Sequence, residues 1–498
     1  MIKNYIIYYY QKTLLFTLLV FSISINSQVG IGTTTPDASS ILDLSSTSKG
    51  MLAPRMTTAQ RIAIASPVDG LLVYDTTLKL FYYYVSPAGS WSAVGSSLTE
   101  RSNFKRIKST DVLSTVLSAE LTAGAGAKYV MNPNTLYEIN GQVQFNFPID
   151  INNSYIHGLD TNNDIIIRPT GNIFEGAIGG SIKNVTLIAS GGSVFNLSGT
   201  AAQNLVFRDC VVAGSNSVGT ISGFGLVFLS IVQFSANTNG ITYNNISQLL
   251  LSNLGWFANN SGTYEKLTGT FSLVEKQGGF THVESGTATG FDVSTAGLSV
   301  GSGILESLVF TGTNIGGYVK PYATGIFPGY NFNNNWIVRS SGIPTESDNN
   351  AVGDFTVDYA VGSGIGVSFN TSNPSNIVKI GSITSISTSS NLFRFSTDGA
   401  VPNRLKYLGK NKRIFQITGS VSFQVPAAGT YIIYIAKNGT VLSQFKVYGR
   451  GSAVNDIVVI PINATTELLN NDYIEIFVQR YSGSTGDIVV PNMSITIK

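Results

Sequence analysis

The sequence predicts an all-β protein in which a right-handed parallel β-helix is followed by a jelly-roll β-sandwich, behind a small β-rich N-terminal region. Three observations carry this prediction: a repeat of short apolar runs about every 20 residues, a C-terminal series of alternating strands, and the composition. Charged residues are 12% and apolar residues 43% of the 498 residues, and 52 are glycine. Such a chain can build a core, but its polarity comes from uncharged side chains and the backbone.

The composition also narrows the classes of function. With 30 Lys and Arg against 28 Asp and Glu, the chain lacks the basic excess of a nucleic-acid binder. The single cysteine, Cys210, cannot form an internal disulfide or a thiolate metal cage. Gly30-x-Gly32 lacks the third glycine and the βαβ unit of a dinucleotide loop. We therefore expect no cofactor, no structural metal and no nucleic-acid partner.

The length is typical of two to four domains, and composition shifts divide the chain into six segments. These are a signal peptide (1–27), an N-terminal surface-protein or neck region (28–97), a linker (98–137), a parallel β-helix (138–320), a β-rich connector (321–390) and a jelly roll (391–498).

The first segment has the order of features found in export signals. Lys3 and Lys12 precede an apolar run at residues 14–25, which is shorter than the roughly 20 residues that span a bilayer. Cleavage is expected between Ser27 and Gln28, and an uncleaved anchor is the alternative. No later stretch reaches transmembrane length, so we expect an exported protein with no membrane span after signal removal.

The second segment contains short strand-like runs and one expected helix. The runs are at residues 71–75 and 80–84, and the helix at 57–65 would begin with a Thr cap. Val29-Gly30-Ile31-Gly32-Thr33-Thr34, Leu42-Asp43, Pro54-Arg55-Met56-Thr57 and Gln60-Arg61 resemble the N-terminal region of many secreted surface proteins of Bacteroidota. The resemblance implies lineage and export, and says nothing of chemistry. In the linker, residues 111–121 fit either a short helix or a strand.

Residues 138–320 carry the repeat. Segments starting at Asn184, Asn204, Gly225 and Gln248 are 20, 21 and 23 residues apart. Because strand side chains alternate, two sets of positions should fill the solenoid interior: Val185, Leu205, Leu226 and Leu249, then Leu187, Phe207, Phe228 and Leu251. A leucine-rich repeat is the rival at this period, but no recurring helical stretch supports it.

Residues 391–498 read as a compact β domain. The candidate strands are 391–396, 404–408, 413–425, 430–437, 441–448, 456–462, 473–480 and 488–498, with a hairpin signal at Lys437-Asn438-Gly439. The alternation from Phe415 to Val425, Gly429-x-Tyr431, Ala436-Lys437-Asn438-Gly439 and Asn471-Asp472-Tyr473-Ile474-Glu475 resemble C1q/TNF-like jelly rolls at the tips of phage fibres and secreted trimers. The resemblance implies trimerisation and fixes no ligand.

Residues 98–498 as a whole resemble fibre or spike proteins of phages that infect Bacteroidota. The motifs are Leu136-Tyr137-Glu138-Ile139-Asn140-Gly141, then Trp336-Ile337-Val338-Arg339 and Gly342-Ile343-Pro344-x-Glu346-Ser347-Asp348. The export signal departs from that family and favours a cellular surface protein or a prophage-derived module.

Parallel β-helices often carry polysaccharide lyases and hydrolases, whose sites need clustered carboxylates. The best candidate is Arg208-Asp209, but the aligned coils offer Ala189, Ser230 and Asn253 beside Asp209, and so no second carboxylate. We therefore interpret this pair as a surface ion pair or turn contact. A partner from an unaligned loop or another chain would restore a catalytic site.

The remaining candidates each have a plain structural interpretation. His157-x-x-Asp160 and Asp164 lie in an Asn/Asp-rich loop that offers oxygen ligands for Ca²⁺, although such residues also favour turns. His282-x-Glu284 supplies only two ligands. Cys210 lies among valines and is expected to be a buried apolar residue. The aromatic residues Trp256 and Trp336 are either glycan platforms or core residues.

The sequence thus favours an exported, homotrimeric, fibre-like surface protein that binds glycans or another cell surface without catalysis. A polysaccharide lyase or hydrolase on the β-helix face is the second hypothesis, and a phage-derived assembly protein without a ligand is the third. We assign no catalytic, cofactor or metal residue.

Overall fold

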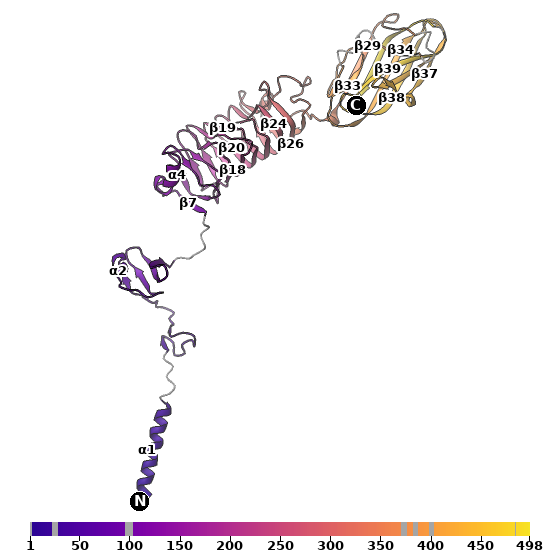
Figure 1. The fold of residues 1–498 in the computed structure, drawn as a ribbon. Helices are drawn as coiled ribbons and strands as arrows, with labels where there is room; N and C mark the ends of the chain where they lie inside the picture. The colour runs from indigo at the N-terminus through magenta and orange to yellow at the C-terminus, as the bar shows by residue number, and fades with distance from the viewer. Residues whose placement is uncertain are drawn as a thin grey trace. The chain divides into compact units, whose positions relative to one another are not determined.

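The computed structural model describes residues 2–21, 28–94, 103–369, 376–381, 387–397, 403–483 and 485–498. The chain forms two compact units, Met1–Glu100 and Arg101–Lys498 (Figure 1). The boundary expected between residues 97 and 98 lies outside the described residues.

The first unit begins with helix α1 (Ile2–Phe21), which covers part of the segment expected to be a signal peptide, residues 1–27. Within the described part of the chain, no helix combines the length and hydropathy needed to cross a bilayer. Of the two residues at the expected cleavage point, Ser27 lies outside the described residues and Gln28 directly precedes strand β1 (Val29–Ile31). The signal peptide and its cleavage remain predictions.

The rest of the first unit consists of two small sheets and one helix. Strand β1 pairs in parallel with β2 (Leu42–Leu44). The second sheet has the order β3 (Arg55–Met56), β4 (Leu72–Asp75), β5 (Leu80–Val85), β6 (Ser90–Ala93). Helix α2 (Thr58–Ile62) starts at the expected cap: Thr57 and Gln60 form a reciprocal capping box. Its Arg61 forms a buried ion pair with Asp75 at 3.0 Å.

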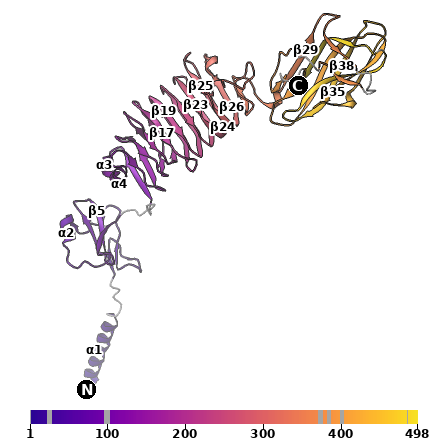
Figure 2. The same cartoon turned by 45° about the horizontal axis from the view of Figure 1, so that its top comes forward.

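The second unit opens with a parallel β-helix, as expected (Figure 2). Its larger, thirteen-stranded sheet contains β7 (Phe104–Lys108), β9 (Leu136–Asn140), β10 (Gln142–Gln144), β12 (Tyr155–His157), β13 (Ile165–Ile167), β15 (Gly180–Lys183), β16 (Thr186–Ile188), β18 (Asn204–Ala213), β20 (Leu226–Ser235), β22 (Gln248–Trp256), β24 (Thr270–His282), β26 (Ser299–Thr311) and β28 (Trp336–Ser341). The nine-stranded sheet contains β8 (Tyr129–Val130), β11 (Ile149–Asp150), β14 (Phe174–Gly176), β17 (Ser193–Ser198), β19 (Ser217–Ser222), β21 (Ile241–Asn244), β23 (Thr263–Thr268), β25 (Thr289–Asp292) and β27 (Val319–Lys320).

The expected repeat is present, but the predicted alignment of its strands is shifted by one residue in one coil. Leu205 pairs with Val227, and Val227 with Leu249. Val227 and Leu229 are therefore the buried residues, whereas Leu226 and Phe228 face outward and are only partly covered. A shift of one residue moves every side chain of a strand to the opposite face. The expected first segment is also displaced, because Leu187 pairs with Val212 rather than with Phe207.

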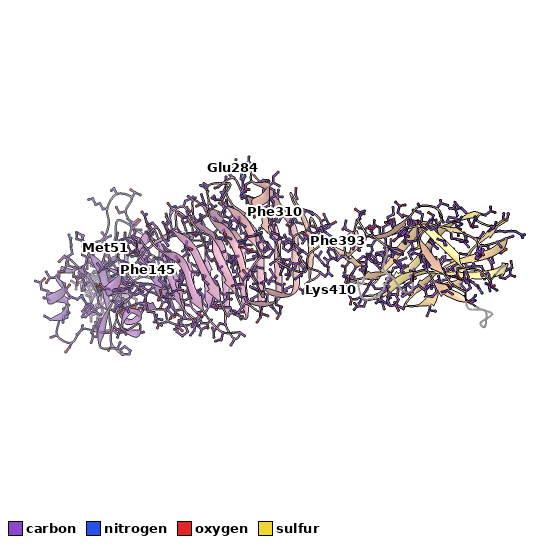
Figure 3. The ribbon with its side chains drawn as sticks, turned by 90° about the horizontal axis from the view of Figure 1, so that it is seen from above. Met51, Phe145, Glu284, Phe310, Phe393 and Lys410 are labelled. Atoms are coloured by element: carbon purple, nitrogen blue, oxygen red, sulfur yellow. The ribbon has the colours of Figure 1, made fainter. Side chains whose placement is uncertain are left out.

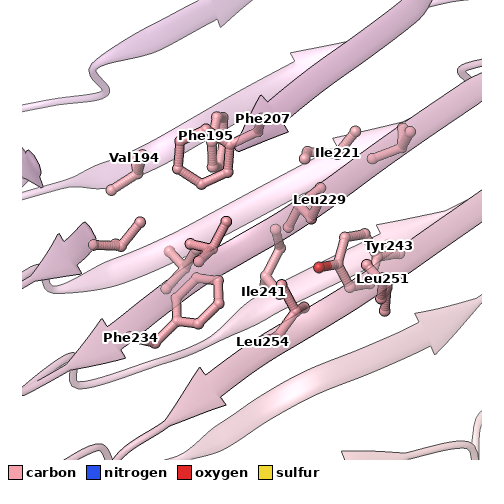
Figure 4. Close-up of a cluster of buried hydrophobic side chains, with 14 of the residues drawn as sticks. Val194, Phe195, Phe207, Ile221, Leu229, Phe234, Ile241, Tyr243, Leu251 and Leu254 are labelled. Carbon is pink, nitrogen blue, oxygen red and sulfur yellow. The ribbon is translucent and has the colours of Figure 1, made fainter. Parts of the chain in front are cut away.

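Apolar side chains from both sheets fill the solenoid interior, as Figure 4 shows for Leu229 of the larger sheet and for Phe195 and Ile241 of the nine-stranded sheet. An aromatic stack continues the core: the rings of Phe234 and Trp256 lie 4.0 Å apart between centroids. Tyr264 also stacks on Trp256, with 5.1 Å between the ring centroids. Such stacks add to the stability that burial of apolar area provides.

A column of residues with left-handed backbone marks one corner of the solenoid. The strand registers align Asn184, Asp209, Ile231, Asn253, Gly278 and Ser307, whose φ angles lie between 53° and 66°. Each such residue bends its strand, so the larger sheet is divided into two faces along the solenoid. Asn, Asp and Gly tolerate this conformation, whereas a β-branched residue such as Ile231 is strained there.

Residues 98–137 were expected to be a linker, and the described part instead closes the end of the solenoid. Strand β7 pairs in parallel with β9, so the larger sheet already begins at Phe104. Helices α3 (Leu113–Val116) and α4 (Ser118–Ala123) follow. Buried Glu120 of α4 lies 2.6 Å from Lys105 and accepts a hydrogen bond from the Tyr137 hydroxyl at 2.8 Å. A solenoid end must be capped because its last coil would expose the core.

The second unit ends in an antiparallel β-sandwich, as expected for a jelly roll. One sheet has the order β29 (Gly353–Asp358), β40 (Ile488–Ile497), β34 (Arg413–Gln424), β38 (Ile457–Leu468), with β30 (Ile365–Val367) also on β40. The other has the order β32 (Phe395–Ser396), β33 (Leu405–Tyr407), β39 (Tyr473–Gly483), β35 (Gly429–Lys437), β36 (Thr440–Val441), with β31 (Ile377–Lys379) on β39 and β37 (Val447–Gly451) on β35. Short 3₁₀ turns lie at η1 (Ile315–Gly317), η2 (Asp348–Asn350) and η3 (Ser443–Phe445).

The expected connector, residues 321–390, does not form a separate region. Strand β28 is the last strand of the larger solenoid sheet, and β29 to β31 belong to the sandwich. The sandwich thus begins near Gly353 rather than at residue 391. The hairpin signal is confirmed: Asn438 and Gly439 both have positive φ between β35 and β36, as a two-residue type I′ turn requires.

Candidate functional site: a groove on the flank of the solenoid

Two adjoining hollows lie beside the left-handed corner of the solenoid. Their volumes are about 350 Å³ and 630 Å³, and Thr161, Val211 and Gln233 line both. The first also contains Asp160 and Asp209. We name the two hollows together the flank groove. It follows the solenoid from one coil to the next and is open to solvent.

Outward side chains of successive strands form the floor of the flank groove. Val211 of β18 and Gln233 of β20 are neighbours in the parallel register. Phe257 follows β22 directly, is 39% exposed, and meets Phe280 edge to face at 5.1 Å. The floor therefore combines apolar surface with an amide. An exposed aromatic ring lies at its far end.

The wall of the flank groove is the loop of residues 158–164, held by Asp164. The backbone N–H groups of Gly141, Leu159 and Asp160 donate to its carboxylate at 2.6–3.0 Å. Burial alone would raise the pKa of Asp164, but these three donors outweigh burial and lower it. The Thr186 hydroxyl adds a 2.6 Å hydrogen bond to the Thr161 carbonyl. The Asp164 carboxylate thus fixes the path of this loop through local hydrogen bonds.

The structure brings a second carboxylate to Asp209 that sequence alignment of the coils had missed. Asp160 and Asp209 line the same hollow. Asp160 accepts hydrogen bonds from the Asn162 backbone at 2.9 Å and the Asn163 side chain at 2.6 Å. Asp209 lies 3.7 Å from the guanidinium of Arg208, as the expected ion pair requires. Asp160 belongs to a loop outside the repeat, so aligning the coils did not detect it.

Two positively charged side chains on the other side of the left-handed corner affect the pKa of His157. Its strand neighbours include Lys183, and Lys183 pairs with Arg208 in the next coil. Burial lowers the pKa of His157, and the charges of Lys183 and Arg208 lower it further. The imidazole is therefore neutral at pH 7. It forms no metal site with Asp160 and Asp164: the described residues contain no group of three His, Cys, Asp or Glu side chains placed to hold a metal ion.

The other candidate residues have structural roles. His282 lies 3.0 Å from Glu284, which projects from the solenoid surface (Figure 3) and also accepts a hydrogen bond from the Thr313 hydroxyl. Cys210 is 2% exposed, and burial raises its pKa to about 12, which excludes a nucleophilic thiolate. Trp256 and Trp336 are fully buried, so the idea that either stacks on a sugar is wrong.

Comparison with known proteins identifies one segment of the chain. Residues 30–109 match a family model described as a phage tail-like trimerisation region. The match confirms the predicted resemblance to phage fibre proteins and supports a homotrimeric, fibre-like protein. It covers most of the first unit together with strand β7. No curated protein matches the chain.

Two kinds of solved structure are similar to this chain at low identity. Tailspike protein 4 of bacteriophage CBA120 aligns with 90% of this chain and 77% of its own, at 8% identity and a TM-score of 0.23. Murine APRIL aligns with 30% of this chain and 98% of its own, at 11% identity and a TM-score of 0.20. At these identities and scores, neither likeness bears on function.

Proposed function

We propose that this protein is an exported, trimeric, fibre-like surface protein that binds an extended polysaccharide along the flank groove without cleaving it. The observation that carries the proposal is the pair of adjoining hollows, which join successive coils and so offer one continuous path. Sites for neutral ligands combine apolar surface with a few fixed polar groups, which fits Val211, Gln233 and Phe257. Three copies in a trimer would strengthen weak individual sites through effective concentration.

The proposal is tested with the variants Phe257→Ala and Gln233→Ala, and with Thr220→Ala as a matched control. Thr220 is an exposed residue of β19 in the other sheet, so its loss leaves the groove intact. Removing an aromatic contact costs about 1 kcal/mol, so Phe257→Ala should weaken polysaccharide binding roughly fivefold. Binding is measured by calorimetry against a panel of surface polysaccharides. Equal affinity of all four proteins, or no binding by any, contradicts the proposal.

A second function is favoured by one observation, the shared lining of a hollow by Asp160 and Asp209. Two carboxylates in one cleft are the minimum that glycoside hydrolysis requires. If this pair is catalytic, Asp160→Asn and Asp209→Asn should each lower turnover at least about a hundredfold. Asparagine keeps the size of both side chains and tolerates the left-handed backbone of Asp209. The assay follows new reducing ends and unsaturated products, and their absence with every polysaccharide tested rejects catalysis.

A further inference from the structure

The outer face of the larger sheet carries a column of mainly apolar side chains on the opposite side of the left-handed corner from the flank groove. One residue from each of ten successive strands contributes: Phe104, Leu136, Tyr155, Ser181, Val206, Phe228, Leu250, Glu275, Ile304 and Ile337. We name this set the apolar column. Eight of its ten members are apolar or aromatic, although all of them point away from the solenoid core.

Every member of the apolar column is exposed or partly exposed in the described chain. Tyr155 is 44% exposed and Ile337 is 38% exposed. Val206, Phe228 and Leu250 are partly buried, and neighbours stacked roughly 4.8 Å away along the sheet cover part of each. Outward positions of a sheet that faces water are normally polar. A continuous apolar stripe on such a face therefore indicates a surface that another molecule covers.

A polar column borders the apolar column two residues further along each strand. It contains the ion pair of Arg106 with Glu138 and that of Arg339 with Glu306. Ser230 and Ser252 lie between these pairs in the parallel register. An apolar centre beside a polar, solvent-accessible edge is the usual composition of a protein–protein interface. The apolar column carries polar side chains at only two of its ten positions, Ser181 and Glu275, which suits a protein partner better than a polysaccharide.

The apolar column continues a segment already assigned to trimerisation. The matched trimerisation region ends at residue 109 and so includes β7, whose Phe104 is the first residue of the apolar column. In the first unit, the same region exposes large apolar side chains: Ile31 is 58%, Ile41 79% and Leu52 82% exposed. Association that involves these segments would place identical solenoids side by side.

We propose that the apolar column is the surface through which three copies of this chain pack around a common threefold axis. The inference rests on the trimer of the proposed function and adds the face that the solenoids use. In a cyclic trimer of parallel chains, equivalent residues lie at one height, and side chains that face the axis meet their own counterparts. Phe228 would then lie close to Phe228 of the other two copies, while the flank groove would stay open to solvent.

Cysteine cross-linking in the full-length protein tests the proposal. Phe228→Cys and Leu250→Cys each place a thiol on the apolar column, and a short bis-maleimide should link two chains of every trimer. Matched controls are Gln233→Cys in the flank groove and Thr220→Cys on the other sheet, both exposed. The native Cys210 is a suitable background because it is buried with its pKa raised to about 12. We expect covalent dimers to form at least tenfold faster from the column variants than from the controls.

The outcomes separate this inference from the proposed function. A trimeric mass by light scattering, with equally slow cross-linking at all four positions, overturns the apolar column as the packing face. Two column variants are used because one substitution can disturb folding at a single coil. If only one of them fails to cross-link, the other variant decides the outcome. Polysaccharide binding is measured on the wild-type protein, so a failure of binding leaves the cross-linking result intact.

Discussion

At the scale of single residues, backbone geometry explains which residue types occupy the left-handed corner of the solenoid, whereas the reactivity of their side chains does not. Asp209 seemed a catalytic candidate because of its charge, and it belongs to the corner column of left-handed residues together with Asn184 and Asn253. Short polar side chains suit this conformation because they clash least and bond to nearby backbone. Ile231 is the exception: it has φ of 54°, is 54% exposed and lines the flank groove. Strained residues of this kind concentrate at functional sites.

The strain at Ile231 gives the first prediction. Ile231→Asn should raise the free energy of unfolding by about 1 kcal/mol, because asparagine adopts a positive φ at lower cost. Denaturant unfolding checks this, with Val211→Asn as the control. Val211 is also an outward residue of the groove, but it is not among the residues with positive φ. A loss of stability on Ile231→Asn, equal to that of the control, would show that Ile231 is not strained.

The candidate site could be predicted only in part at this scale. The sequence shows Asp209 and the Asn/Asp-rich loop as separate features, and it gives the correct structural interpretation of Cys210. It cannot show that Asp160 and Asp209 share a hollow, because the loop falls outside the repeat and its position depends on three backbone bonds to Asp164. The sequence also leaves the role of Trp256 open, since a tryptophan in a β-rich chain can pack into the core or lie on the surface.

At the scale of elements, the predicted strands were mostly right and their register was not. The error arose in β20, where Leu226, Val227, Phe228 and Leu229 are all apolar and so show no alternation. The structure supplies the reason: Val227 and Leu229 fill the core while Phe228 belongs to the apolar column. A surface that is apolar on both faces hides the period-two signal on which register prediction depends. In the sandwich, β34 alternates and its bounds were predicted to within one residue. The expected strand 441–448 is wrong, because these residues are divided among β36, η3 and β37.

The junction between the solenoid and the sandwich accounts for the motif that follows Trp336. Arg394 donates to the Trp336 carbonyl at 2.7 Å and to Asn334 at 2.9 Å. Asp348 accepts from the backbone N–H groups of Lys410 and Asn411 at 3.0 and 2.8 Å. Glu346 is fully buried beside these groups and accepts from the N–H groups of residues 331 and 332 at 2.7 and 3.0 Å. The charged motif is thus a structural joint.

Glu346 makes the stability of this joint depend on pH. Burial raises its pKa from 4.5 to about 7, although two backbone donors and Arg394 oppose the rise. A carboxyl with a raised pKa binds its proton more tightly in the folded chain. Its contribution to stability is therefore complete below pH 4.5 and is lost as the pH rises through about 7. The full loss is on the order of 3 kcal/mol.

The measurement is the thermal unfolding midpoint between pH 5 and 8 for the wild type, Glu346→Gln and a control. The wild-type midpoint should fall across this range, and Glu346→Gln should flatten the fall whatever its own baseline stability. The control, Glu306→Gln, removes a carboxylate from an exposed ion pair with Arg339 and should keep the wild-type slope. Identical slopes in all three proteins would place the titration elsewhere.

At the scale of the whole molecule, composition and period were sufficient to predict a solenoid followed by a sandwich. The expected boundaries were wrong at both ends of the solenoid, for one physical reason. A stack of coils must be closed, and the closing pieces do not repeat: α3, α4 and β7 at one end, and the joint around Glu346 at the other. Periodicity therefore detects the middle of a solenoid and misses its ends.

Trimer formation gives the last prediction, because two surfaces are available for it. The hydrophobic clusters of the solenoid and sandwich contain only residues of the second unit, so residues 103–498 should fold without the first. The full chain has a mass of 53.0 kDa, and light scattering should give three times the chain mass.

Removing residues 28–94 deletes the exposed apolar strands β1 and β2 but keeps the whole apolar column. The shortened protein should therefore remain trimeric at high concentration and dissociate on dilution, since one of two linked contacts is lost. A monomer at every concentration would assign trimerisation to the first unit alone, and a trimer that resists dilution would assign it to the solenoid.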